Sequence, residues 1–359
     1  MKKNNIIITT VTLAIVGLLV ANIRVNDNTF LTDLFRQGDS IQTETSLSDN
    51  ELEYQIPMTS LFNGTSEATK PAHSNSDTPN PAFMDYDDEW CLAMTDLNSK
   101  DRDYYQRELD DWRLSKGRVT AAVNDGIGGI YFPDSSQYIA PYMGSSYDAV
   151  LQQINSNNKF AMLAALKRQD FNIESKQNIA QQLVINGYTS VLSDLVRVEF
   201  VQAIMGYNQT QQLNADIKDH LKRAMAYIAY GIEYYDLDAV LAYLSIVGSD
   251  DFPLDLKPRY SLGTDNHVQQ YVDSLTQWID EARDNENLQL PTAEELPKVA
   301  RHAFEGRLAR LYLEFGNELS DLKATLPKNT STMLDRSECV ERQVVFFGDL
   351  ERRARSSIK

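Results

Sequence analysis

Three patterns of apolar and polar residues divide this chain. Residues 6–23 are apolar almost throughout, interrupted by three threonines, one glycine and one asparagine and by no ionisable side chain. Residues 25–83 show no sustained period in their few apolar positions. From residue 84 to about residue 350, apolar residues recur at three- and four-residue intervals, which is the spacing of one face of an α-helix. The pattern predicts an apolar N-terminal helix, an irregular segment and a helical body.

The apolar run at residues 6–23 has the length of a membrane-spanning helix. As a helix it would rise about 27 Å, close to the ~30 Å hydrocarbon core of a bilayer. Lys2 and Lys3 precede it, and the positively charged flank of such a helix stays in the cytoplasm. We therefore predict a signal anchor at residues 1–24 that crosses a bacterial inner membrane once and leaves the following domain on the periplasmic side.

A cleaved signal peptide is the alternative reading of this run. Cleavage would follow Ala21 and would place Leu19 at the −3 position, where a small residue is required. The run is also longer than the apolar region of most cleaved signals. Both points favour an uncleaved anchor.

Residues 25–83 predict a disordered linker. Ser, Thr, Asn, Asp and Pro dominate the segment, and such a composition buries too little apolar surface to offset the entropy of an ordered chain.

The helical body is predicted at residues 84–350, followed by a basic tail at 351–359. Its first helix should begin near Ser99 and end near Gly117, with Tyr105, Leu109 and Trp112 on one apolar face. Further apolar stripes with helical spacing run from Ile217 to Ile232, from Leu237 to Val247, from Val268 to Ala282 and from Phe304 to Phe315. Alternation typical of strands is nearly absent, so the predicted fold class is all-α.

Two local signals refine this picture. Gly126, Gly128 and Gly129 interrupt residues 118–146, which predicts a long loop with a short hairpin. Thr292 and Glu295 have the spacing of a capping box, which predicts that a helix opens at Thr292.

An Ala- and Leu-rich helix recurs about every 34 residues within residues 147–247. The recurring segments are FAMLAALKRQ, IAQQLVINGYTSVLSDLV and LKRAMAYIAYGIEYYDLDAVLAYL. In these segments the chain resembles tetratricopeptide and Sel1-like α-helical repeats. The resemblance implies stacked helix hairpins in a solenoid-like domain, and it implies protein binding; it transfers no site residues.

Composition and charge narrow the partners. The net charge of −17 argues against nucleic acid, whose phosphates need a positive surface. The glycines at 126–129 follow no buried strand and precede no Lys-Ser/Thr pair, so we predict no cofactor site. Asp216 and His220 are the one i,i+4 pair suited to a metal, and two ligands do not complete a site, so we predict none.

The chain has two cysteines, Cys91 and Cys339. In an exported protein they can form one disulfide that ties the start of the body to its end, and the alternative is two separate buried thiols.

Tyr227, Tyr230 and Tyr234 follow one helical face. Such a stripe is typical of packing in the core, with an aromatic binding groove for a peptide or glycan as the alternative.

No catalytic motif stands out, so the catalytic residues are unknown from sequence. The leading hypothesis is a membrane-anchored envelope protein that binds another protein through a helical-repeat surface. The alternative is an envelope enzyme that acts on a glycan or peptide through carboxylates assembled by the fold.

Overall fold

The structure is a computed structural model that describes residues 99–119, 123–124, 130–131, 136–249, 252–263, 267–292 and 295–357. The predicted signal anchor at 1–24 and the predicted linker at 25–83 lie outside these residues. Within the described part of the chain, none of the helices combines the length and the apolar character that a bilayer crossing requires.

The described residues are mostly helical, which confirms the prediction of an α-helical body. The helices are α2 (Ser99–Ser115), α3 (Ser136–Met143), α4 (Tyr147–Asn155), α5 (Lys159–Lys167), α6 (Ile173–Ile185), α7 (Leu192–Thr210), α8 (Ala215–Glu233), α9 (Asp238–Val247), α10 (Pro258–Ser261), α11 (Val268–Glu286), α12 (Lys298–Glu314), α13 (Gly316–Lys323), α14 (Lys328–Met333) and α15 (Glu338–Ser357). Short 3₁₀ turns, η1 (Thr189–Val191) and η2 (Leu254–Leu256), precede α7 and α10.

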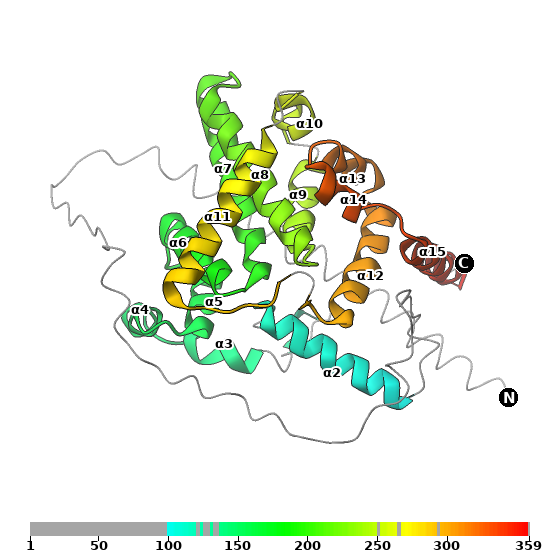
Figure 1. The fold of residues 1–359 in the computed structure, drawn as a ribbon, viewed down its shortest axis with the longest axis horizontal. Coiled ribbons are helices and arrows are strands. Elements are labelled where there is room, and N and C mark those ends of the chain that lie inside the picture. The colour runs from blue at the N-terminus through cyan, green and yellow to red at the C-terminus, as the bar shows by residue number, and fades with distance from the viewer. Residues whose placement is uncertain are drawn as a thin grey trace.

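The antiparallel pair α7 and α8 forms the centre of the molecule. Helix α11 packs across α8 and α6, and α9 packs on α7 (Figure 1). The apolar stripe predicted for α8 is buried throughout, at Ile217, Leu221, Met225, Ile228 and Ile232. Burying a side chain of this size stabilises the fold by about 1.5–3 kcal/mol. This stripe therefore holds the central helices together.

Asparagine side chains begin three of the helices. Asn158 accepts hydrogen bonds from two backbone N–H groups of α5, Asn172 accepts one from Ser175, and Asn214 accepts one from Ile217. Each satisfies donors that the first turn of a helix leaves unpaired.

The capping-box prediction placed the start of α12 too early. Glu295 does accept hydrogen bonds from the backbone and hydroxyl of Thr292, at 2.9 and 3.1 Å, but these bonds form a turn. Helix α12 begins at Lys298, immediately after Pro297. The proline ring disfavours helical backbone at the residue before it, so the helix cannot run through Leu296.

The loop between α2 and α3 contains the predicted hairpin. Strands β1 (Val123–Asn124) and β2 (Ile130–Tyr131) pair antiparallel. Ahead of them, Gly117 ends α2 with a φ of +79°, and a Cβ there would lie 2.5 Å from Tyr188. Only glycine fits this turn without strain or displacement.

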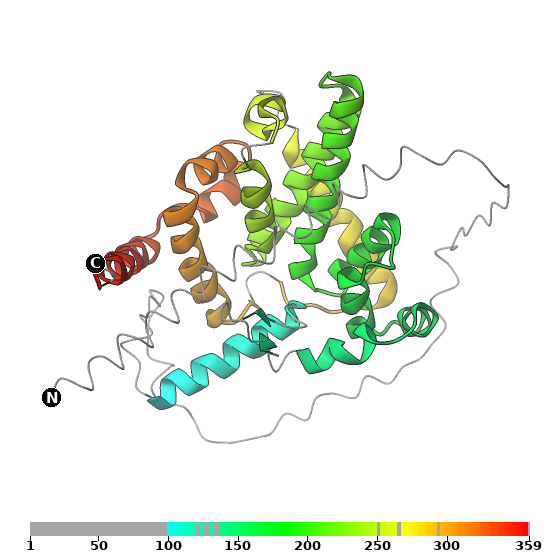
Figure 2. The ribbon, with the colours of Figure 1, turned by 180° about the vertical axis from the view of Figure 1, so that it is seen from behind.

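The C-terminal helix α15 packs on α12 and continues through Ser357. It therefore includes residues 351–357 of the predicted basic tail. In the two opposite views it lies at the edge of the molecule, on the side where the chain ends (Figures 1 and 2).

Candidate functional site

Helix α2 docks on the body through three side chains of one face. Tyr105, Leu109 and Trp112 are buried, and they form a small apolar cluster with Val299 and Ala300 of α12. Their spacing of i, i+4 and i+7 is the one that the sequence predicted for this face. Among the described residues, this cluster is separate from the main core around α7 and α8.

The surface that receives α2 comes mainly from the first half of α12. We call it the docking strip; its members are Leu296, Val299, Ala300, Ala303 and, from the turn after α8, Tyr235. The two alanines keep α12 narrow, which lets another helix approach closely. Tyr235 packs against both apolar clusters, and its ring centroid lies 5.6 Å from that of Phe304. The docking strip therefore joins α2 to the main core.

One polar contact gives this docking its specificity. The Tyr105 hydroxyl lies 2.6 Å from Nδ1 of His302, and their rings meet edge to face with centroids 5.1 Å apart. Burial raises the pKa of Tyr105 to about 12, so the phenol keeps its proton at neutral pH. The phenol can donate to Nδ1, or Nδ1–H of the other tautomer can donate to the phenol oxygen. A helix without a polar group at this position would leave the buried imidazole nitrogen without this bond.

A group of charged residues, which we call the charged hub, fixes the C-terminal end of α2. Arg118 donates to Asp236 at 2.8 Å and to Asp238 at 2.7 Å. Thr189 donates to the second oxygen of Asp236 at 2.8 Å, and Arg307 of α12 pairs with Asp238. The Asp236 side chain is only 2% exposed, so its charge depends on these partners.

The pKa values of the charged hub follow from its pairing. Burial acts to raise the pKa of Asp238, but Arg118 and Arg307 outweigh it and bring that pKa to about 2. Burial acts to lower the pKa of Arg118, but Asp236 and Asp238 outweigh it and hold the pKa above its usual value. Asp238 and Arg118 therefore stay charged around neutral pH, which suits a structural latch better than proton transfer.

Lys116 lies next to the charged hub and has an unusual environment. Its ammonium nitrogen is 4.4 Å from the ring centroid of Trp112 and 5.7 Å from that of Tyr234. Burial lowers the pKa of Lys116 to about 8, and the positive charges of Arg283 and Arg118 act in the same direction, against Asp236. Lys116 therefore loses its proton at a lower pH than an ordinary lysine does.

The three tyrosines for which a groove was the alternative, Tyr227, Tyr230 and Tyr234, are packed into the protein. Tyr227 and Tyr230 are buried and Tyr234 is half-buried. The rings of Tyr230 and Tyr234 have centroids 4.8 Å apart, and burial raises the pKa of Tyr227 and of Tyr230. In this structure these side chains contribute to packing between helices.

The histidine of the predicted Asp216–His220 pair has a different carboxylate partner. Nδ1 of His220 lies 2.7 Å from Glu199, whose side chain is 1% exposed, and Arg223 donates to the same oxygen at 3.0 Å. Within the described residues, no group of three His, Cys, Asp or Glu side chains is placed to hold a metal ion. The arrangement neutralises a buried glutamate between α7 and α8.

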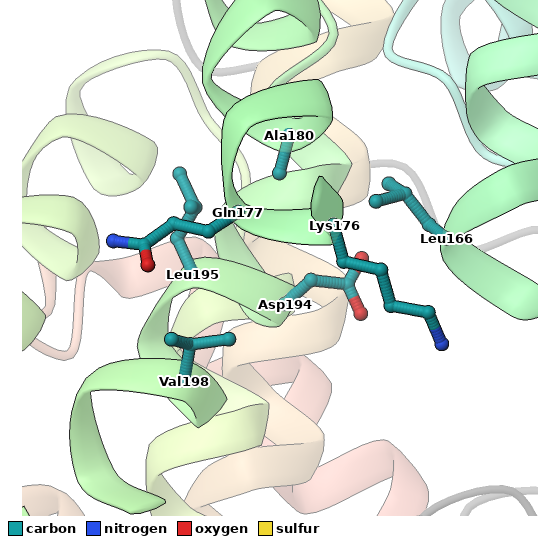
Figure 3. Close-up of a pocket in the computed structure, with 7 residues that line it drawn as sticks. All are labelled: Leu166, Lys176, Gln177, Ala180, Asp194, Leu195 and Val198. Atoms are coloured by element: carbon teal, nitrogen blue, oxygen red, sulfur yellow. The ribbon is translucent and has the colours of Figure 1, made fainter. Parts of the chain in front are cut away.

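A small cavity between α6 and α7 is bordered by another carboxylate with a shifted pKa, Asp194. Lys176 and Asp194 lie side by side at its edge, beside Leu166 and Val198 (Figure 3). Burial raises the pKa of Asp194 and lowers that of Lys176. The cavity has a volume of about 20 Å³, room for about one water molecule. A sugar ring or a peptide does not fit there.

The predicted disulfide falls partly outside the described residues. Cys339 lies in the first turn of α15, and Cys91 is not among them, so the bond stays a prediction.

The sequence predicted the docking face of α2 but missed what it docks on. His302, Asp236 and Asp238 carried no motif, because their partners on and after α2 are more than a hundred residues away in the chain. The Asp-Leu-Asp triplet at 236–238, which leads into the first residue of α9, was the one local signal available.

No protein-family model matches this chain, and comparisons with curated proteins and with solved structures found no match. The resemblance to tetratricopeptide and Sel1-like repeats therefore stays a prediction from residues 147–247, and the function has to be argued from geometry.

Proposed function

We propose that this chain is a membrane-anchored envelope protein whose helical body binds another protein. The observation that carries the proposal is the way α2 sits on α12. Three large side chains at i, i+4 and i+7 of an amphipathic helix enter one apolar surface, which is a common mode of helix recognition between proteins. This contact supports the proposal, because it gives an example of the helix-on-helix packing that a helical ligand of this body would use.

Other features support a binding role. The antiparallel packing of α7 and α8 is of the kind that stacked helix hairpins use, in line with the repeat resemblance. The apolar run at residues 6–23 would anchor the protein, and a flexible linker of roughly sixty residues would hold the body on the order of 40 Å from the bilayer. Such a tether suits a protein that meets partners in the periplasm.

The alternative of an envelope enzyme rests on carboxyl groups with raised pKa. Burial raises the pKa of Asp194 and of Glu305, as a general acid requires. Asp194 borders a cavity that holds about one water molecule, and Glu305 pairs with Arg301 on the same helix. The cavity beside Asp194 is too small for a sugar or a peptide, and Glu305 is engaged in an ion pair. The binding role is therefore the better supported of the two.

The binding role can be tested by co-purification from detergent-solubilised membranes. The full-length chain is compared with Ala303→Asp in the docking strip and with Val345→Asp, a matched charge substitution at an exposed position of α15. We expect at least one protein, identified by mass spectrometry and then reconstituted in pure form, to bind the wild type and Val345→Asp and to bind Ala303→Asp at least tenfold less. Recovery of the same proteins with an unrelated tagged membrane protein would contradict the proposal.

The anchor is tested by fractionation. We expect the full-length chain to stay with the membrane after an alkaline carbonate wash, and recovery of the unprocessed chain in the soluble fraction would contradict the membrane assignment.

The Cys91–Cys339 disulfide is part of the same proposal, since it requires an oxidising compartment. On a non-reducing gel, the wild type should migrate differently with and without reductant, and Cys91→Ser should lose that difference. Identical migration of the wild type in both conditions would contradict the bond.

A further inference from the structure

We infer that the side-chain amine of Lys116 is a reactive site that takes up carbon dioxide as a carbamate, which the neighbouring guanidinium groups stabilise. This inference goes beyond the proposed binding function and does not depend on it. Three features of the site support it: the amine is enclosed, it has no acceptor bound to it, and the charges beside it favour an anionic product.

Aromatic rings enclose the amine of Lys116. Its nitrogen lies 4.4 Å from the ring centroid of Trp112 and 5.7 Å from that of Tyr234, and the residue is 8% exposed. The backbone of Lys116 is fixed as well, because its carbonyl accepts a 3.0 Å hydrogen bond from the backbone N–H of Ser190. The small exposed area therefore admits only a small reagent to an amine that is held in place.

The nitrogen of Lys116 has no hydrogen bond or ion pair with any residue in the part of the chain that the structure describes. Asp236 is close enough to act on its charge, but the two oxygens of that carboxylate bind Arg118 and Thr189, each at 2.8 Å. A buried ammonium group without an acceptor is costly. Burial of this kind favours the neutral amine, which is the nucleophilic form of a lysine.

The electrostatics of the site agree with this geometry. Burial lowers the pKa of Lys116 to about 8, and the positive charges of Arg283 and Arg118 act in the same direction, against Asp236. At a pH of about 8, roughly half of the molecules therefore carry the neutral amine, compared with less than about 1% for an ordinary lysine.

The charges around Lys116 favour carbon dioxide over other electrophiles. The nitrogen lone pair forms a bond to the carbon, one carbon–oxygen π pair moves onto an oxygen, and the nitrogen loses a proton to solvent. The product is an anion close to the guanidinium groups of Arg283 and Arg118, which attract it. A Schiff base with an aldehyde is neutral or cationic, and an amide is neutral, so neither product gains from these charges.

Lys159 offers a matched comparison within the same chain. Its nitrogen lies 5.8 Å from the ring centroid of Tyr188, and burial lowers its pKa too. The charged group that acts on Lys159 is Glu286, which would repel a carbamate. Both lysines therefore lie near an aromatic ring, and they differ in the charges that surround them.

The probe is isotope-labelled carbon dioxide in bicarbonate buffer, equilibrated with the full-length protein in detergent at a pH of about 8. Triethyloxonium ion then traps carbamates as ethyl esters, and peptide mass spectrometry locates them. We expect the trapped fraction at Lys116 to be at least tenfold that at Lys159. In guanidinium chloride the trapped fraction at Lys116 should fall at least tenfold, because unfolding exposes the amine and separates it from Arg283.

Carbon NMR of the untrapped protein gives an independent readout. One carbamate resonance of the wild type should be missing from Lys116→Arg and present in Lys159→Arg, and both variants keep the positive charge of the residue that they replace. The comparison of folded and unfolded wild type does not depend on a variant's folding.

Equal trapping at Lys116 and Lys159, or equal trapping at Lys116 in folded and unfolded protein, would overturn the inference. A carbamate at Lys116 in a protein that captures no partner leaves the inference standing while the proposed function falls. A captured partner without a carbamate gives the reverse result.

Discussion

Helices α8 and α2 are both amphipathic and nearly equal in length, but they are held in different ways. Eleven of the nineteen residues of α8 are buried, and they contact α7, α9, α11 and α14. Helix α2 has seventeen residues and buries Tyr105, Leu109 and Trp112 against α12. Helix α8 buries most of its surface in the core, whereas α2 rests on the body along one face.

This difference separates the contacts that stabilise the fold from the contacts that select the helix docked on α12. The stripe of α8 fixes the fold, because removing any part of it leaves a cavity inside the main core. The face of α2 buries less apolar surface than the stripe of α8 does. The hydrogen bond between Tyr105 and His302 and the contacts of Arg118 in the charged hub fix the position of α2 along α12. Four substitutions test this division, from the largest expected effect to the smallest.

Leu221→Ala should destabilise the protein most, by about 3–4 kcal/mol, because Leu221 is fully buried in the stripe of α8. Urea unfolding of the full chain followed by circular dichroism measures the change. The control Gln209→Ala lies at an exposed position near the end of α7 and should change stability by less than ~0.5 kcal/mol. Similar values for the two variants would show that α8 is not the centre of the fold.

Asp236→Ala should cost about 2–4 kcal/mol. It leaves Arg118 and Thr189 without the buried carboxylate that pairs with them, and an incompletely paired charge is costly to bury. Asp110→Ala removes an exposed ion pair with Arg113 and should cost less than ~1 kcal/mol in the same unfolding measurement. If Asp236→Ala is as mild as Asp110→Ala, the charged hub does not latch the end of α2.

Lys116→Met should change the pH dependence of stability. The folded pKa of Lys116 is about 8 and its ordinary value is 10.5, so the unfolded chain binds more protons between these pH values. Wild-type stability should therefore gain on the order of 1–3 kcal/mol from this group as the pH rises from about 8 to about 10.5, and the variant should lack that gain.

The free energy of unfolding of the wild type and of Lys116→Met is measured at pH 7 and at pH 10, and the difference between the two proteins is taken at each pH. The contributions of other groups that titrate in this range are the same in both proteins and cancel. A difference that does not change with pH would show that Lys116 is not buried as described.

Leu109→Ala should have the smallest effect on global stability, about 1–2 kcal/mol, although Leu109 is nearly as buried as the residues of α8. Local opening of α2 absorbs part of the loss, so its amides should exchange faster while those of α8 keep their protection. Hydrogen exchange read by mass spectrometry separates the two helices. If α8 loses as much protection as α2 does, the two helices unfold as one cooperative unit and the prediction is wrong.

Much of the secondary structure was predictable because it depends on neighbours in the chain. The stripe from Ile217 to Ile232 and the face of Tyr105, Leu109 and Trp112 have helical spacing, and the structure confirms both helices. Thr292 and Glu295 show the limit of such signals. Their hydrogen bonds form as expected, yet the helix starts after Pro297, because a proline two residues later overrides the capping pattern.

The sequence by itself determined that this protein has a helical body and which face of each main helix is apolar, because helical spacing records burial directly. Only the tertiary structure decided which faces meet. It placed His302 against Tyr105, and it placed Asp236 and Asp238 against Arg118 across more than a hundred residues of chain. Pairings of this kind depend on the packing of whole helices, and a single sequence carries no local signal for them.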